Sequence, residues 1–181
     1  MKTTLAYLLL LPLVAATTHR GSGTINADDV VPMRTDGVTL SIRPVRWMVV
    51  GGGATHTVPS GRTVPVTVQA QIAKGWHIYS ISQKPGGPIP LSIRLVDSSD
   101  AVIRGVIKAP RPERQFDKNF GIETELYSGN PQFTLQLGAR KPTRGIQDVQ
   151  LGARYQVCSE TLCLPPRTDT LDLRLRIVSR S

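Results

Sequence analysis

The sequence is poor in cysteine, in aromatic residues and in long hydrophobic runs. Two of its 181 residues are cysteine, and aromatic side chains make up 5% of the chain. Two cysteines form one bridge at most, which excludes a disulfide-rich scaffold. The low aromatic content leaves few stacking surfaces for single-stranded nucleic acid. Beyond the N-terminus no apolar run is long enough to span a bilayer, which excludes a multi-pass membrane protein.

Helical periodicity and internal repeats are also missing, so neither a helical bundle nor a solenoid is expected. Hydrophobic and polar residues alternate instead, most clearly over 62–73, as in a strand with one buried face. The 16 glycines and 14 prolines are scattered and supply frequent turns. This pattern predicts an all-β antiparallel sandwich. The expected strands lie at 37–50, 62–73, 76–80, 91–96, 102–107, 132–137, 149–157 and 171–178.

The chain is strongly basic, with 22 Lys and Arg against 13 Asp and Glu and a formal net charge of +9. Such a balance suggests an anionic partner, which can be nucleic acid, a membrane surface or an acidic protein. The arginines are dispersed over the expected strands and do not form the basic stripe of a nucleic-acid-binding protein. We therefore expect no nucleic acid among the partners.

The N-terminus has the pattern of an export signal. A short basic start precedes the apolar run 5–16, which is too short to span a bilayer comfortably and ends in small residues. We expect residues 1–16 to be a signal peptide, 17–36 a flexible leader and 37–181 a single domain. The mature chain would then be periplasmic or secreted, with no stable membrane insertion after cleavage, where cysteines can be paired.

Cys158 and Cys163 are separated by four residues and are followed by Pro165 and Pro166. Cysteines that flank a hairpin tip can reach the separation that a disulfide needs. So small a loop gives a stabilisation of only about 2 kcal/mol from chain entropy, which suggests that the bond matters chemically as well as structurally. Three uses stay open: thiol–disulfide exchange, a structural bridge, and a metal site that includes His77.

A long polar stretch, 109–127, contains Phe116, Phe120 and Tyr127 and shows no strand pattern. Loops of this length in a compact domain are usually functional. Aromatic side chains exposed in a polar loop cost solubility, so we expect Phe116 and Phe120 to cover something.

Four patches of the chain together resemble a known family. They are Gly75–Ser80, Pro85–Pro88, Phe116–Gly129 and Tyr155–Pro166, the last of which contains Tyr-Gln-Val-Cys and Cys-Leu-Pro-Pro. Their order and spacing resemble the N-terminal periplasmic domain of DsbD, the thiol:disulfide interchange protein, over residues 37–178. The resemblance implies an immunoglobulin-like antiparallel β-sandwich with a redox-active cysteine pair. It also implies a role in reducing periplasmic disulfides, including those of cytochrome c biogenesis.

The resemblance assigns a role to each cysteine and to each partner. Cys163 matches the cysteine that forms mixed disulfides with partners, and Cys158 matches the resolving cysteine. The donor would be a thioredoxin-like domain or a membrane electron conduit. The acceptor would be a periplasmic disulfide protein, such as a disulfide isomerase or a cytochrome c maturation reductant. No cofactor or metal is needed, and any enzymatic activity would be that of a protein-disulfide reductase.

The resemblance also implies a cap over the cysteine pair. Residues 117–121, which begin with Asp117, match a loop that covers the pair and swings away when a partner docks. Asn119 stands where a shielding phenylalanine is expected, and we assign the shielding to Phe120 instead. His77 and Tyr79 match aromatic positions beside the pair.

The chain departs from the family pattern in two further respects. The spacing between the cysteines is one residue shorter than in the best-known member. The sequence ends at Ser181 without a membrane-spanning conduit or a thioredoxin-like domain, so we expect a stand-alone domain that takes electrons from a separate protein. The alternative hypothesis is an immunoglobulin-like binding or scaffold module with a purely structural disulfide. A metal chaperone that uses both thiolates and His77 is a third hypothesis.

Overall fold

The computed structural model describes residues 30–35, 38–52, 55–96, 101–140 and 144–179. The regular elements in these ranges are all strands, and no helix in them is long and apolar enough to cross a membrane. The predicted signal peptide and most of the predicted leader lie outside the described residues. The strands are β1 (Val30–Thr35), β2 (Val38–Ile42), β3 (Val45–Val49), β4 (Thr55–Pro59), β5 (Thr63–Ile72), β6 (His77–Tyr79), β7 (Ser92–Leu95), β8 (Ala101–Lys108), β9 (Glu113–Asp117), β10 (Ile122–Tyr127), β11 (Gln132–Ala139), β12 (Gly145–Tyr155), β13 (Val157–Cys158) and β14 (Arg167–Val178).

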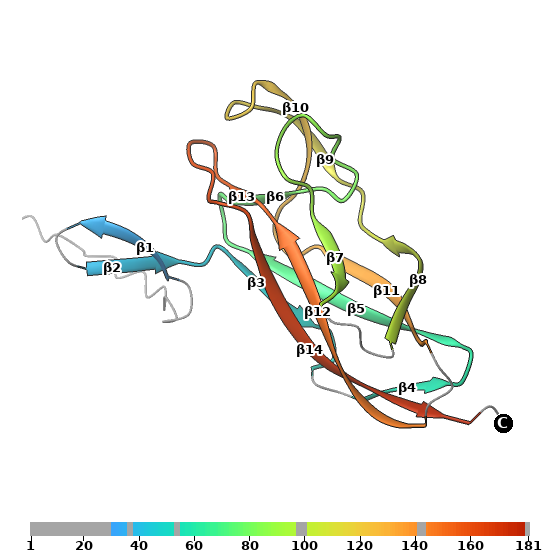
Figure 1. Cartoon of the computed structure of the whole chain (residues 1–181). Helices are drawn as coiled ribbons and strands as arrows, with labels where there is room; N and C mark the ends of the chain where they lie inside the picture. Colours follow the sequence, from blue (N-terminus) through green and yellow to red (C-terminus); the bar gives the residue numbers. More distant parts are fainter. Residues whose placement is uncertain (1–29, 36–37, 53–54, 97–100, 141–143, 180–181) are drawn as a thin grey trace, which may run out of the picture.

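Two four-stranded sheets of the described strands make the body of the molecule (Figure 1). The first core sheet has the order β3-β5-β11-β8 and is antiparallel throughout. The second core sheet has the order β4-β14-β12-β7, in which β4 is parallel to β14 and the other pairs are antiparallel. The predicted all-β, immunoglobulin-like sandwich is confirmed, with one parallel edge pair that the sequence pattern did not predict.

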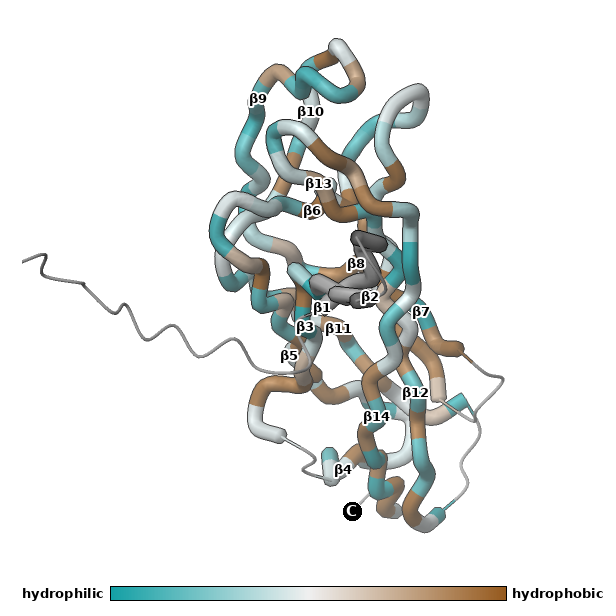
Figure 2. Tube along the Cα trace, turned by 90° about the vertical axis from the view of Figure 1, so that its left-hand side faces the viewer, coloured by the Kyte–Doolittle hydropathy of each residue, from teal (hydrophilic) through white to brown (hydrophobic). Residues whose placement is uncertain are grey.

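Alternating residue types place the hydrophobic core between these two sheets. In β14, Leu171, Leu173, Leu175 and Ile177 are buried, and the residues between them are exposed. Figure 2 shows this alternation of hydrophobic and hydrophilic residues along β12 and β14. Burying one such side chain stabilises the fold by about 1.5–3 kcal/mol relative to leaving it exposed. A register slip of one residue would turn the whole set toward solvent, so the pattern specifies the register.

A separate hairpin precedes the sandwich. Strands β1 and β2 pair antiparallel with each other and belong to neither core sheet. Figure 1 shows this hairpin projecting from the body of the molecule. Strand β1 lies within 17–36, which we expected to be a leader, and the boundary between leader and domain stays a prediction.

A third four-stranded sheet of the described residues lies at one end of the sandwich (Figure 1). Its order is β13-β6-β10-β9, and we call it the site sheet. Side chains alternate between its two faces. One face contributes Ile78, Tyr127 and Val157 to the sandwich core. The opposite face carries a smaller buried cluster, which we call the site cluster and which consists of Tyr79, Leu126 and Cys158.

The expectation of a loop over 109–127 is wrong for most of that stretch. Strands β9 and β10 form an antiparallel hairpin there, with a turn at 118–121 between them. The first four residues of β9 are all exposed, so the strand has no alternation of buried and exposed positions for a sequence pattern to reveal. The loop therefore shrinks to the turn between the two strands.

Candidate functional site

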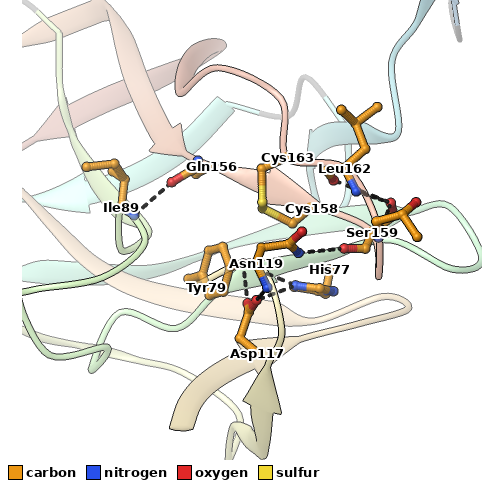
Figure 3. Close-up of a disulfide and its surroundings, with 11 residues drawn as sticks. His77, Tyr79, Ile89, Asp117, Asn119, Gln156, Cys158, Ser159, Leu162 and Cys163 are labelled. Carbon is orange, nitrogen blue, oxygen red and sulfur yellow. Dashed lines mark hydrogen bonds and ion pairs between the residues drawn. A yellow bond between two sulfur atoms is a disulfide. The ribbon is translucent and has the colours of Figure 1, made fainter. Parts of the chain in front are cut away.

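The two cysteines form a disulfide at the tip of a hairpin (Figure 3). Cys158 ends β13, and Cys163 lies opposite it in an antiparallel bridge, with 4.1 Å between the two Cα atoms. Backbone hydrogen bonds flank this pair on both sides, from Ser159 N to Leu162 O and from Leu164 N to Val157 O. The cysteines therefore occupy a non-hydrogen-bonded pair, the closest cross-strand position in an antiparallel ladder. The hairpin thus brings the two sulfur atoms within bonding distance.

The two cysteines differ in exposure. Cys158 is fully buried, whereas Cys163 is partly exposed. Cys158 belongs to the site cluster, and Cys163 packs against that cluster together with Phe120. Cys163 is therefore the more accessible residue of the two.

The strand register explains why polar side chains share the face of Cys158. His77 of β6 is the register partner of Cys158, and Tyr79 lies two residues further along the same strand. On the other side of β6, Leu126 of β10 pairs with Tyr79. Asp117 of β9 lies on the same face. Its register partner in β10 is four residues from Leu126, and residues an even number of positions apart in a strand share a face.

These polar side chains form a buried network (Figure 3). The Tyr79 hydroxyl donates a hydrogen bond of 2.5 Å to Asp117 Oδ2. His77 Nε2 lies 3.4 Å from the Tyr79 hydroxyl and 3.9 Å from Asp117 Oδ2. His77, Tyr79 and Asp117 are all buried, with Asp117 only 3% exposed. A buried carboxylate needs such donors, since leaving it unpaired costs several kcal/mol.

The network holds Tyr79 and His77 in defined protonation states. Burial raises the pKa of Tyr79 far above its ordinary value, and the hydrogen bond to Asp117 and the charge of that carboxylate raise it further. Tyr79 therefore stays a hydrogen-bond donor at all physiological pH values. Burial lowers the pKa of His77 below 6.5, and the nearby Asp117 carboxylate offsets only part of this shift. His77 is therefore neutral at pH 7.

Asp117 also organises the turn between β9 and β10, which we call the cap turn (residues 118–121). Asp117 Oδ1 accepts a hydrogen bond of 2.8 Å from Asn119 N, and the Asp117 carbonyl accepts one of 2.7 Å from Gly121 N. Gly121 closes the turn with φ +68°, a left-handed conformation that favours glycine. The side-chain amide of Asn119 donates a hydrogen bond of 3.1 Å to Ser159 O (Figure 3). This bond fastens the cap turn to the cysteine hairpin.

Phe120 contacts the site cluster from the cap turn. Its ring meets the ring of Tyr79 edge to face, with 5.9 Å between the centroids. Phe120 packs against the same cluster as the disulfide. Phe116, which we also expected to cover something, is 59% exposed and lies on the rim of a shallow groove between the cap turn and the cysteine hairpin.

The structure brings together every residue of the predicted site: Cys158, Cys163, His77, Tyr79, Asp117, Asn119 and Phe120. Sequence reasoning missed two contributors, Ser159 and Leu126. The Ser159 hydroxyl accepts hydrogen bonds of 3.3 Å from Thr161 N and 3.1 Å from Leu162 N, which shapes the hairpin tip. Its position directly after Cys158 is a signal, since serine often bonds to the backbone of turns. Leu126 lies in the stretch that was expected to be a loop.

In the described ranges no three His, Cys, Asp or Glu side chains come together in a way that could hold a metal ion. His77, the one histidine near the cysteines in the described structure, is engaged with Tyr79 and Asp117. The metal-chaperone hypothesis thus gains no support from the geometry.

Residues 49–175 match the family described as thiol:disulfide interchange protein DsbD, N-terminal. This chain belongs to that family. The match covers the whole site sheet, including the cysteine hairpin, and both core sheets apart from most of β3 and the end of β14. Membership of the DsbD N-terminal family, together with the Cys158–Cys163 disulfide, supports a thiol–disulfide exchange module. Among curated proteins no sequence matches.

Solved structures of related domains are distant from this chain. The reduced DsbD N-terminal domain of Neisseria meningitidis is 22% identical, covers 61% of this chain with 83% of its own length, and has a TM-score of 0.43. The N-terminal periplasmic domain of ScsB from Proteus mirabilis is 21% identical and covers 71% of this chain with 44% of its own length, with a TM-score of 0.48. The complex between the DsbD and PilB N-terminal domains of N. meningitidis is 20% identical, with coverages of 64% and 80% and a TM-score of 0.41. These values are too low to carry properties of those proteins over to this chain.

Proposed function

We propose that this chain passes reducing equivalents from a thioredoxin-like donor to periplasmic disulfide proteins through Cys158 and Cys163. The observation that carries the proposal is the unequal exposure of the two cysteines, with Cys158 buried and Cys163 partly open to solvent. Exchange requires a sulfur that a partner thiolate can reach, and unequal access makes one of the two sulfurs the preferred site of attack. The export-signal pattern of the first residues supports a periplasmic location.

In the loading step, a donor thiolate attacks the sulfur of Cys163. The Cys158–Cys163 bond breaks, a bond forms between Cys163 and the donor, and Cys158 leaves as a thiolate. The second donor cysteine then attacks its neighbour in this mixed disulfide and releases Cys163. Two electrons and two protons pass to the module in total. In the delivery step Cys163 attacks a client disulfide, and Cys158 resolves the mixed disulfide and restores the starting bond.

The residues around the disulfide have positioning roles in this proposal. Tyr79 and His77 form the wall of the pocket that holds Cys158, and Asp117 orients both Tyr79 and the cap turn. Phe120 shields the disulfide, and the hydrogen bond from Asn119 to Ser159 O keeps the cap turn closed between encounters. Partner docking replaces these contacts. The cap turn thereby limits access by small oxidants.

The proposal is tested by trapping. Cys158→Ser leaves Cys163 without the resolving cysteine of its own chain, so a stable mixed disulfide should accumulate with a thioredoxin-like protein whose second cysteine is also replaced by Ser and whose remaining cysteine is activated as a thionitrobenzoate disulfide. Cys163→Ser is the matched control and should trap nothing, because its remaining thiol is buried. Equal trapping by both variants would contradict the assigned roles, and no trapping by either would contradict exchange.

The reduction potential separates exchange from the scaffold alternative. Equilibration in glutathione or dithiothreitol buffers gives the potential of the Cys158–Cys163 pair. Structural bridges in secreted proteins typically lie below about −300 mV, whereas exchange-active ones lie higher. We expect the higher range, together with fast reduction of the folded protein. A bond that is reduced only after unfolding would instead support a binding or scaffold module.

A further inference from the structure

A shallow groove on the outer face of the second core sheet lies outside the exchange site. It is lined by Ser92, Arg94 and Leu95 of β7, Val96 just after that strand, Gly152 and Arg154 of β12, and Thr168 of β14. Ile93 and Ala153 are buried, so their neighbours Arg94 and Arg154 point away from the core. The groove is therefore formed by the solvent-facing residues of three adjacent strands.

Gly152 lies at the floor of this groove. A Cβ atom at this position would lie 2.9 Å from Val96 Cγ2 and 3.3 Å from Thr168 Cγ2. The absence of a side chain thus lets Val96 and Thr168, which lie to either side of β12, approach Gly152 closely. Val96 is 50% exposed and gives the groove an apolar wall.

Arg94 and Arg154 supply a positive charge that the described structure leaves uncompensated. Arg94 is the register partner of Gly152, and Arg154 lies two residues further along β12. Diagonal neighbours of this kind are about 7–8 Å apart, close enough for both guanidinium groups to engage carboxylates of one extended chain. Neither arginine has an ion-pair partner in the described part of the chain, in contrast to Arg114 and Arg167, which pair with Glu125 and Asp169.

The edge of β7 beside this groove pairs with none of the described strands. Strand β7 is an edge strand of the second core sheet. Val96 N donates to Gln150 O, which sets the phase of the ladder. Ile93 and Leu95 therefore direct their backbone N–H and C=O groups away from β12, toward this edge. An extended segment can hydrogen-bond there, and its alternate side chains would then lie beside the groove.

We propose that this groove and edge bind an extended acidic segment of the redox partner. The identity of the protein that supplies the segment rests on the proposed exchange function, whereas the presence of the groove does not. The closeness of the groove to the disulfide supports a redox partner, because Arg154 precedes Cys158 by four residues on one extended run, a distance of about 13 Å. Nucleic acid is disfavoured because no aromatic residue lines the groove. A membrane surface is disfavoured because the same sheet face also carries Asp148 and Asp172.

The test is a titration of the oxidised protein with two labelled peptides, followed by fluorescence anisotropy. The probe is acetyl-Glu-Thr-Glu-Val-Glu-Thr-amide, and its control has Gln in place of each Glu. The protein variants are Arg94→Gln with Arg154→Gln, and the matched pair Arg174→Gln with Arg176→Gln at the far end of the same sheet. We expect the Glu peptide to bind, more weakly as salt is added, and to lose about tenfold in affinity in the first variant only.

Several results would overturn the proposal. They are equal affinity for the Gln peptide, equal loss in both variants, or no binding of the Glu peptide at millimolar concentration. Binding of anionic vesicles or oligonucleotides in place of the peptide would also overturn it. The rate of disulfide reduction by dithiothreitol should be the same in all variants, because no arginine of the groove contacts the disulfide. If the peptide binds but Cys158→Ser traps no partner, the binding proposal for the groove stands and only the exchange function is contradicted.

Discussion

The hydrogen bond between Tyr79 and Asp117 should contribute measurably to stability, and a double-mutant cycle isolates it. The Tyr79 hydroxyl is fully buried and donates at 2.5 Å to a carboxylate that is 3% exposed. Hydrogen bonds to charged groups contribute about 1.5–3 kcal/mol, and an orphaned buried hydroxyl costs about 1–3 kcal/mol. Asp117→Ala also removes the acceptor of Asn119 N, which is near the surface and can bond to water instead.

We therefore expect Asp117→Ala to lower the free energy of unfolding by about 3 kcal/mol and Tyr79→Phe by about 2 kcal/mol. The double variant should lose less than the sum, which gives a coupling energy of about 1.5 kcal/mol. The assay is urea unfolding of the oxidised proteins. Asp172→Ala is the matched control, since this exposed carboxylate accepts one bond from Gln150 and its loss should cost no more than about 0.5 kcal/mol.

A coupling energy below about 0.5 kcal/mol would refute the reasoning, because it would mean that the two groups do not depend on each other. The same holds if Asp117→Ala is no more destabilising than Asp172→Ala. In either case the carboxylate would not be the residue that orients Tyr79 and the cap turn. The assignment of Asp117 as a positioning residue would then be wrong.

Further predictions concern the shield, the histidine and the core. Phe120→Ala should speed the reduction of the folded protein by dithiothreitol severalfold, while Phe116→Ala, whose ring is exposed, should leave the rate unchanged. His77 has a folded-state pKa below its unfolded value, so its contribution to stability is full above about pH 6.5 and is lost as the pH falls through the lower folded value. Wild type should therefore lose more stability than His77→Gln between pH 8 and pH 5 in urea titrations; equal losses would contradict the burial of a neutral ring. Asp117→Asn removes the charge that raises the pKa of His77, so this pKa should fall further in NMR titrations. Leu175→Ala should cost about 3 kcal/mol in urea unfolding, as expected for a fully buried leucine, and a loss below about 1 kcal/mol would contradict its place in the core.

The sandwich could be predicted where one face of a strand is buried. Strands β5 and β14 have strict alternation, and both expected ranges overlap them closely. Strand β4 was missed because it is short and has Val58 as its one fully buried residue. Strand β9 was missed because its first four residues are exposed on both faces. The local pattern carries no information about such strands, because pairing with a neighbour rather than burial keeps them extended.

The site could be predicted only in part, and for a different reason. The cysteine spacing is compatible with a bridge across a hairpin tip, and the resemblance to the DsbD N-terminal family supplied the roles of the neighbouring residues. Neither indicates that Asp117 bonds to Tyr79, which is 38 residues away in sequence. That contact depends on the order of strands in the site sheet, a long-range property. Ser159 shows the opposite case, since its turn-forming role is local and could have been inferred from the sequence.

The proposed opening of the cap turn need not unfold the domain, because the two faces of the site sheet belong to different clusters. Ile78 and Val157 belong to the sandwich core, whereas Tyr79 and Cys158, their neighbours in sequence, belong to the small site cluster. Opening the cap turn breaks the hydrogen bond from Asn119 to Ser159 O and the packing of Phe120, but no contact of the sandwich core. Local opening of this kind costs much less than global unfolding. Substitutions in the cap turn should therefore change the rate of disulfide reduction more than they change the free energy of unfolding, and core substitutions such as Leu175→Ala should do the reverse.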